Sequence, residues 1–140
     1  MSPATAAAYA IPTAPAAEPR KKILLVDDSA TTHMWIRMIL SKTAYELVSA
    51  RDGEEGVRMA VSERPDLILM DVVMPRMNGF EATRALRLYP EMQDIPVIMV
   101  TTRSEAKNVE QGFESGCSDY VTKPIDGLEL VAKVRNFLGE

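Results

Sequence analysis

The sequence is short of cysteine, of basic charge and of long hydrophobic runs, and each shortage excludes a class of protein. Its one cysteine, Cys117, leaves no partner for an internal disulfide, as is usual in the reducing cytosol. It has no run of about 18 apolar residues that could cross a membrane. Sixteen Lys and Arg against 20 Asp and Glu give a formal net charge of −4, without a basic stripe for nucleic acid. We therefore expect a cytoplasmic protein with neither a membrane nor a nucleic-acid partner.

The first 20 residues differ in composition from the rest of the chain. They read MSPATAAAYAIPTAPAAEPR and lack the early basic residues and unbroken apolar core of a signal peptide. A composition so rich in Ala and Pro is typical of a disordered or extended segment. We expect a tail over residues 1–20 and one domain over residues 21–140, because the chain is 46% hydrophobic, enough for one core.

Short apolar runs recur along the domain and leave room for a helix between them. Most runs are continuous, which is typical of parallel strands covered on both faces, whereas Tyr45–Ala50 partly alternates, as an edge strand does. Between the runs, apolar residues recur at helical spacing. The prediction is an α/β fold, a (βα)5 three-layer sandwich with a parallel five-stranded sheet. The continuous runs are Ile23–Val26, Leu67–Met70, Val97–Val100 and Tyr120–Val121.

Polar residues follow these runs where the strands end, the edge at which open α/β sheets bind ligands. They are Asp27, Asp28, Asp71, Thr101 and Lys123. Converging carboxylates raise one another's pKa or hold a cation, and hard oxygen ligands favour Mg²⁺. A carboxylate beside such an ion can also attack a phosphoryl group. The sequence therefore predicts a Mg²⁺ site with Asp71 as the nucleophile, and with Thr101 and Lys123 in contact with the transferred phosphoryl oxygens.

Four motifs in order resemble a known family. LLVDDS, LILMDVVMPRMNG, PVIMVT and YVTKP are similar, over about residues 22–138, to the receiver domain of two-component response regulators. This resemblance implies a flavodoxin-like sheet with strand order 2-1-3-4-5. It implies that Asp28 binds Mg²⁺ directly and Asp27 through bound water. Asp71 would be the phosphoacceptor and a further ligand, together with the backbone carbonyl of Val73.

The same resemblance implies how the domain signals. A sensor histidine kinase or phosphotransfer protein would supply the phosphoryl group, Thr101 would move toward it, and Tyr120 would turn into the vacated space. The bond between Lys123 and Pro124 would be cis. The domain would be no enzyme beyond its own phosphorylation and dephosphorylation, and a monomer or a weak phosphorylation-linked dimer. A downstream protein would bind the face of the fourth helix, last strand and last helix, on which we expect Lys107, Glu110, Gln111, Glu114, Lys133 and Asn136.

Other residues near the predicted site receive plainer interpretations. We interpret His33, in the first predicted helix, as a surface histidine and Cys117 as buried packing. Met74 and Met77 flank the site on a loop and are candidates for contact with a partner. Val73 and Arg103 occupy the two positions that border the path of attacking water in the family. An apolar branched group and a long cation at these positions predict a long-lived acyl phosphate.

Alternatives to a phosphorylated single-domain regulator remain open at this level. One is a receiver-like module that binds partners without phosphorylation. Another is a fragment of a longer regulator with a DNA-binding or enzymatic output domain, whereas a natural end at NFLGE would suit motility control or a phosphorelay. Two enzyme or cofactor classes fit poorly. Haloacid-dehalogenase-type phosphatases need an aspartate two positions after a first-strand nucleophile, and the phosphate of FMN would be repelled by Asp27 and Asp28.

Overall fold

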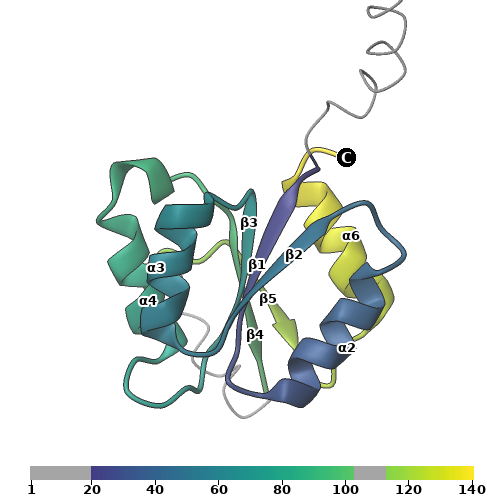
Figure 1. The fold of residues 1–140 in the computed structure, drawn as a ribbon, viewed down its shortest axis with the longest axis horizontal. Coiled ribbons are helices and arrows are strands. Elements are labelled where there is room, and N and C mark those ends of the chain that lie inside the picture. Colours follow the sequence, from purple (N-terminus) through teal and green to yellow (C-terminus); the bar gives the residue numbers. More distant parts are fainter. Residues whose placement is uncertain (1–19, 103–112) are drawn as a thin grey trace, which may run out of the picture.

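One parallel sheet organises the computed structural model, which describes residues 20–102 and 113–140. Its five strands lie in the order β2-β1-β3-β4-β5, and every neighbouring pair is parallel (Figure 1). The predicted fold class and strand order are confirmed, including the edge position of β2. The strands are β1 (Lys22–Val26), β2 (Glu46–Ala50), β3 (Leu67–Asp71), β4 (Val97–Thr101) and β5 (Asp119–Thr122).

Helices cover both faces of this sheet, which makes three layers. Figure 1 shows α2 (Ala30–Leu40) and α6 (Gly127–Phe137) on one face, and α3 (Gly53–Glu63) and α4 (Gly79–Arg87) on the other. A 3-10 turn, η2 (Pro90–Met92), follows α4. A further helical stretch at residues 113–115 ends at Gly116, whose φ of +104° suits a glycine after a helix. No helix in the described ranges has both the length and the hydrophobicity to span a bilayer.

Two hydrophobic cores lie on either side of the sheet. Successive residues of a strand point to opposite faces, so Leu24 and Met70 pack into the core that includes Phe80 of α4, whereas Leu25 and Leu69 pack into the other. All five residues of β3 and of β4 are buried. Burial on both faces is the reason these strands appear in the sequence as unbroken apolar runs.

Side-chain caps fix where the helices begin, next to the carboxyl ends of the strands. Asp52 accepts a hydrogen bond from the N–H of Glu55 at 2.8 Å and caps the start of α3. Asn78 and Glu81 form a capping box at the start of α4. Asp126 caps α6. The caps hold the loops at the edge of the sheet where the polar residues gather.

Candidate functional site

Three aspartates lie together at the carboxyl ends of β1 and β3. These two strands are neighbours at the point where the chain order of the sheet reverses, the usual ligand-binding position in such folds. One carboxylate oxygen from each of Asp27, Asp28 and Asp71 lies within 4.8 Å of the other two. Asp27 and Asp71 are buried and Asp28 is exposed. The structure thus brings together the three acids that the sequence singles out.

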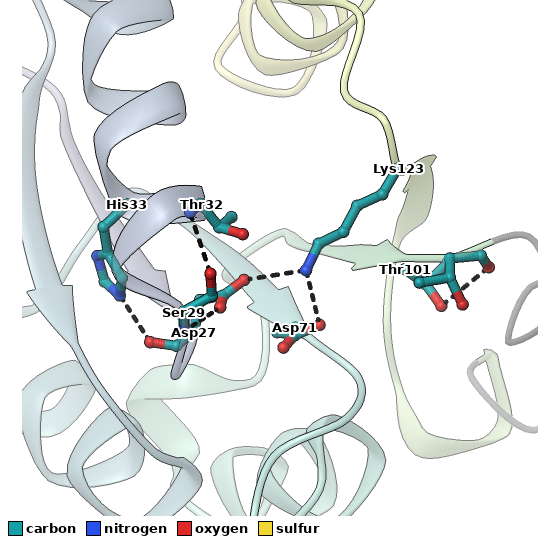
Figure 2. Close-up of polar contacts among 8 residues, drawn as sticks. Asp27, Ser29, Thr32, His33, Asp71, Thr101 and Lys123 are labelled. Atoms are coloured by element: carbon teal, nitrogen blue, oxygen red, sulfur yellow. Dashed lines mark hydrogen bonds and ion pairs between the residues drawn. The ribbon is translucent and has the colours of Figure 1, made fainter.

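Lys123 reaches into this acidic cluster from the end of β5 (Figure 2). Its Nζ lies 3.4 Å from Asp27 Oδ2 and 3.5 Å from Asp71 Oδ1. Its backbone N–H donates a hydrogen bond of 2.6 Å to the carbonyl of Thr101, at the end of the neighbouring strand. The peptide bond between Lys123 and Pro124 is cis, as the family resemblance implies. The lysine is therefore positioned from two strands at once.

The electrostatics of the cluster disfavour a charged Asp71. Burial first, and then the negative charges of Asp27 and, more weakly, Asp28, raise the pKa of the Asp71 carboxyl to about 6, while Lys123 opposes the rise. One ammonium faces three carboxyls, so the negative charge of the fully ionised cluster is only partly compensated. A cation bound among the three acids would relieve this repulsion.

The donor set fits Mg²⁺ rather than a softer metal. All three side chains offer carboxylate oxygens, which hard divalent ions prefer, and no histidine or cysteine belongs to the acidic cluster among the described residues. The exposed Asp28 leaves one side of the cluster open to water and phosphate. Asp27, Asp28 and Asp71 are thus the residues that would hold the ion, and the carbonyl of Val73 remains a predicted fourth ligand.

The loop after Asp71 folds back against its own strand because of a glycine. A Cβ on Gly79 would lie 2.2 Å from the carbonyl oxygen of Asp71, and the Gly79 N–H donates to the carbonyl of Val72 at 2.8 Å. This inward path buries Met74 in the core, so the hypothesis that Met74 contacts a partner is wrong. Met77 is half-buried against the same core.

Thr101 and Tyr120 lie on one face of neighbouring strands. Thr101 is buried at the end of β4 and pairs in register with Thr122, and Tyr120 is two residues before Thr122 on the same face of β5. The Tyr120 ring lies 5.6 Å from the ring of Phe113, with the two planes tilted by 58°. The arrangement is compatible with a switch pair, whose operation stays a prediction. Arg103, Lys107, Glu110 and Gln111 lie outside the described residues.

Ser29, which was not predicted from the sequence, also belongs to the site. Its backbone N–H donates to Asp27 Oδ1 at 2.7 Å, and its hydroxyl oxygen accepts a hydrogen bond of 3.3 Å from the N–H of Thr32. Ser29 thereby caps α2 and holds the carboxylate of Asp27 at the same time. Its place in the sequence could have indicated this role, because a serine directly before a segment with helical apolar spacing is a candidate helix cap.

His33 is buried, so its interpretation as a surface histidine is wrong. Its side chain is 6% exposed, and Nε2 lies 2.6 Å from the backbone carbonyl oxygen of Asp27 (Figure 2). His33 shares the inner face of α2 with Ile36 and Leu40, three and seven residues further along. That helical spacing was the signal that could have placed the histidine inside.

Comparison with known proteins agrees with this geometry. A family model described as the response regulator receiver domain matches residues 23–135. Protein PilH of Pseudomonas aeruginosa is 41% identical over 117 residues, which cover 84% of this chain and 97% of PilH. The DNA-binding dual master transcriptional regulator RpaA of Synechocystis is 38% identical over 117 residues, and the match covers 48% of that protein. The chain thus spans nearly all of PilH and about half of RpaA.

Solved structures give the same result in three dimensions. The receiver domain of the sensor histidine kinase PA1611 from Pseudomonas aeruginosa, solved with a magnesium ion in its active-site cleft, superimposes with a TM-score of 0.80 at 30% identity, covering 87% of this chain and 100% of that one. The Vibrio cholerae chemotaxis protein CheY4 gives a TM-score of 0.80 at 30% identity, covering 85% and 99%. Sequence, fold and site geometry agree, and the chain belongs to the response regulator receiver domain family of two-component signal transduction.

Proposed function

We propose that this domain accepts a phosphoryl group on Asp71, with Mg²⁺ as cofactor, from a sensor histidine kinase or phosphotransfer protein. The observation that carries the proposal is the buried Asp71 carboxyl beside two more acids, with Lys123 Nζ 3.5 Å away. Burial and the neighbouring carboxylates raise the pKa of Asp71, so the ionised cluster does not stabilise the fold by itself. The cluster is well suited to holding a cation and a phosphoryl group.

Each residue has a distinct part in the proposed transfer. A carboxylate oxygen of Asp71 attacks phosphorus, and the P–N bond of the donor phosphohistidine breaks as the new O–P bond forms. Lys123 Nζ exchanges its contact with Asp71 for a phosphoryl oxygen, and the Thr101 hydroxyl donates to another. When bound, Mg²⁺ neutralises the charge that gathers on the transferred oxygens.

The proposed output is a change on the surface of β5 and α6. Phosphorylation adds roughly −1.5 to −2 charges beside Thr101 and draws its hydroxyl inward, which frees space toward Tyr120. Lys133 of α6 connects this strand to the surface, because its Nζ donates to the Tyr120 carbonyl at 2.6 Å and lies 3.4 Å from Asp119. A downstream protein that binds this face would sense the movement of Tyr120 through that connection.

The direct test is labelling with acetyl phosphate, read by intact mass. We expect wild type to gain one phosphoryl group with Mg²⁺ and none with EDTA, and Asp71→Asn to gain none. Asp94→Asn is the matched control, because it removes an exposed carboxyl near the opposite end of β4 and should label like wild type. Labelling of Asp71→Asn to the wild-type level would contradict the assignment. No labelling of wild type, under conditions that label a control receiver, would favour a module that works without phosphorylation.

The decay of the labelled protein tests a second part of the proposal, the long-lived acyl phosphate. Val73 lies two residues after the acceptor, is 58% exposed and carries no group that can orient water. We expect Val73→Asn to shorten the lifetime by about tenfold, because a positioned polar group assists attacking water. Val73→Ile, which stays apolar and branched, should decay like wild type. Equal lifetimes for all three proteins would show that this side chain does not control hydrolysis.

A further inference from the structure

We propose that His33 is a positioning residue of the metal site, which orients the peptide between Asp27 and Asp28 and thereby aims Asp28 at the cation. The inference rests on the proposed Mg²⁺ role of the acids and adds a residue to it. His33 is buried, lies on α2 behind the acids, and contacts the backbone carbonyl of Asp27 rather than a carboxylate.

The chemistry of the contact fixes the tautomer of the His33 ring. Nε2 lies 2.6 Å from the Asp27 carbonyl oxygen, and a carbonyl can only accept, so Nε2 carries the proton. In the neutral ring Nδ1 then carries no proton, and it is buried without a partner among the residues that the structure describes. Burying a polar atom in this way is unfavourable. A leucine would fill the space without that penalty, so packing alone does not explain a histidine here.

The peptide that follows Asp27 has left the sheet and depends on this bond. The Asp27 N–H still donates to the carbonyl of Ala50 at 3.1 Å, so the amino side of the residue is held by the neighbouring strand. The Asp27 carbonyl points to α2, where it accepts from His33. The backbone of Asp27 is therefore held between the sheet on one side and a helix on the other.

The placement of Asp28 depends on the peptides on either side of it, and the following one is held by the Ser29 N–H, which donates to Asp27 Oδ1 at 2.7 Å. The Asp28 side chain is exposed, and no residue in the described ranges donates a hydrogen bond to its carboxylate. The direction of that carboxylate therefore follows the orientation of these two peptides, and His33 holds the one before Asp28. His33 can set this orientation because α2 is packed against the core: Ile36 and Leu40 are buried, and the His33 N–H donates to the Ser29 carbonyl at 3.1 Å.

Metal affinity in substituted proteins tests the proposal. Mn²⁺ would serve as the probe, with its free concentration counted by EPR and Mg²⁺ added as competitor. We expect His33→Leu to weaken binding about tenfold or more, as loss of an outer-shell hydrogen bond usually does. His33→Gln should stay within about threefold of wild type, because its amide N–H can replace the ring donor at similar reach. Ile36→Val is the matched control, since it loosens the same face of α2 and leaves the histidine intact.

The outcomes separate this inference from the function on which it rests. Wild-type affinity in a folded His33→Leu protein, or equal losses in His33→Leu and His33→Gln, would overturn the inference and leave the metal site standing. Failure of wild type to bind either ion would overturn the proposed function and the inference with it. Nitrogen-15 NMR of the wild-type ring gives a test that needs no substitution: we expect a proton on Nε2, and a proton on Nδ1 alone would refute the contact.

Discussion

At the scale of single residues, the burial of Asp71 and the negative charge of its neighbours decide the electrostatics of the site. Burial and the neighbouring acids hold the pKa of Asp71 at about 6, so this carboxyl is harder to ionise than an ordinary aspartate. Lys123 Nζ lies 3.5 Å from Asp71 Oδ1 and partly offsets the unfavourable electrostatic energy of an ionised Asp71. The same ammonium also lies 3.4 Å from Asp27 Oδ2, so its charge is shared between two carboxylates. The metal-free domain should therefore be less stable where all three acids are charged.

Asp71→Asn should consequently stabilise the metal-free domain in a pH-dependent way. The folded pKa lies above the unfolded one, so the contribution of the neutral carboxyl is full below about pH 4 and is lost as pH rises through about 6. At pH 7 the amide should be more stable by about 1–2 kcal/mol, after allowance for solvent screening. Urea unfolding in EDTA at pH 4 and pH 7 measures this difference, with Asp94→Asn as control. An equal effect of Asp71→Asn at both pH values would contradict it.

At the scale of elements, the loops that leave the carboxyl ends of the strands position the acidic residues as much as the strands do. The loop after β3 returns so closely that the carbonyl of Asp71 occupies the place of a side chain on Gly79, the first residue of α4. The loop after β1 is held by Ser29, which joins the carboxylate of Asp27 to the start of α2. Helix starts and acidic residues are thus parts of the same small structures.

Gly79→Ala should damage both stability and the site. The new Cβ would meet backbone atoms of Asp71 and Val72, which cannot move without disturbing the acceptor strand. We expect a loss of about 1–3 kcal/mol in the free energy of unfolding and weaker metal binding. Gly127→Ala is a matched control at the first residue of α6, where the added Cβ would lie 3.4 Å from Ile39, an ordinary contact. Equal behaviour of the two variants in urea unfolding would refute the close-approach argument.

At the scale of the whole molecule, the sheet brings the predicted site residues of four strand ends to one edge. Asp27 and Asp28 follow β1, Asp71 ends β3, Thr101 ends β4 and Lys123 follows β5. Because these elements also form the two cores, occupancy of the site and stability of the domain are linked. A cation bound among the acids should therefore stabilise the whole domain against unfolding, and not only a local segment.

Mg²⁺ should accordingly raise the free energy of unfolding of wild type. At a concentration 100 times the dissociation constant, the expected gain is about 2.7 kcal/mol. Asp28→Asn should lose most of this gain, because the change removes a proposed ligand that is exposed and therefore contributes little to the core. Thermal unfolding with MgCl2, against NaCl at matched ionic strength, measures the effect. A similar gain for both proteins would indicate general screening of charge rather than a site.

The sequence predicted a large part of this molecule for physical reasons that can be named. Strands buried on both faces must be apolar throughout, so Leu67–Met70 and Val97–Val100 were visible as runs, and the residue that follows each run was placed at the functional edge. The inward turn of Met74 was not visible, because a loop leaves no periodic pattern. The burial of His33 was not visible, because the apolar residues beside it, Met34 and Trp35, turn out to be exposed. Only the helical spacing from His33 to Ile36 and Leu40 indicates the buried face.

The sequence by itself determined the fold class, the family and the identity of the residues that meet at the strand ends, because those properties follow from local order along the chain. Only the tertiary structure decided which atoms face one another. It placed Lys123 between two aspartates, brought the backbone of Asp71 against Gly79 and turned the Asp27 carbonyl to His33. These contacts depend on how the helices pack on the sheet. Distances that packing sets cannot be read from the local sequence of either contacting segment.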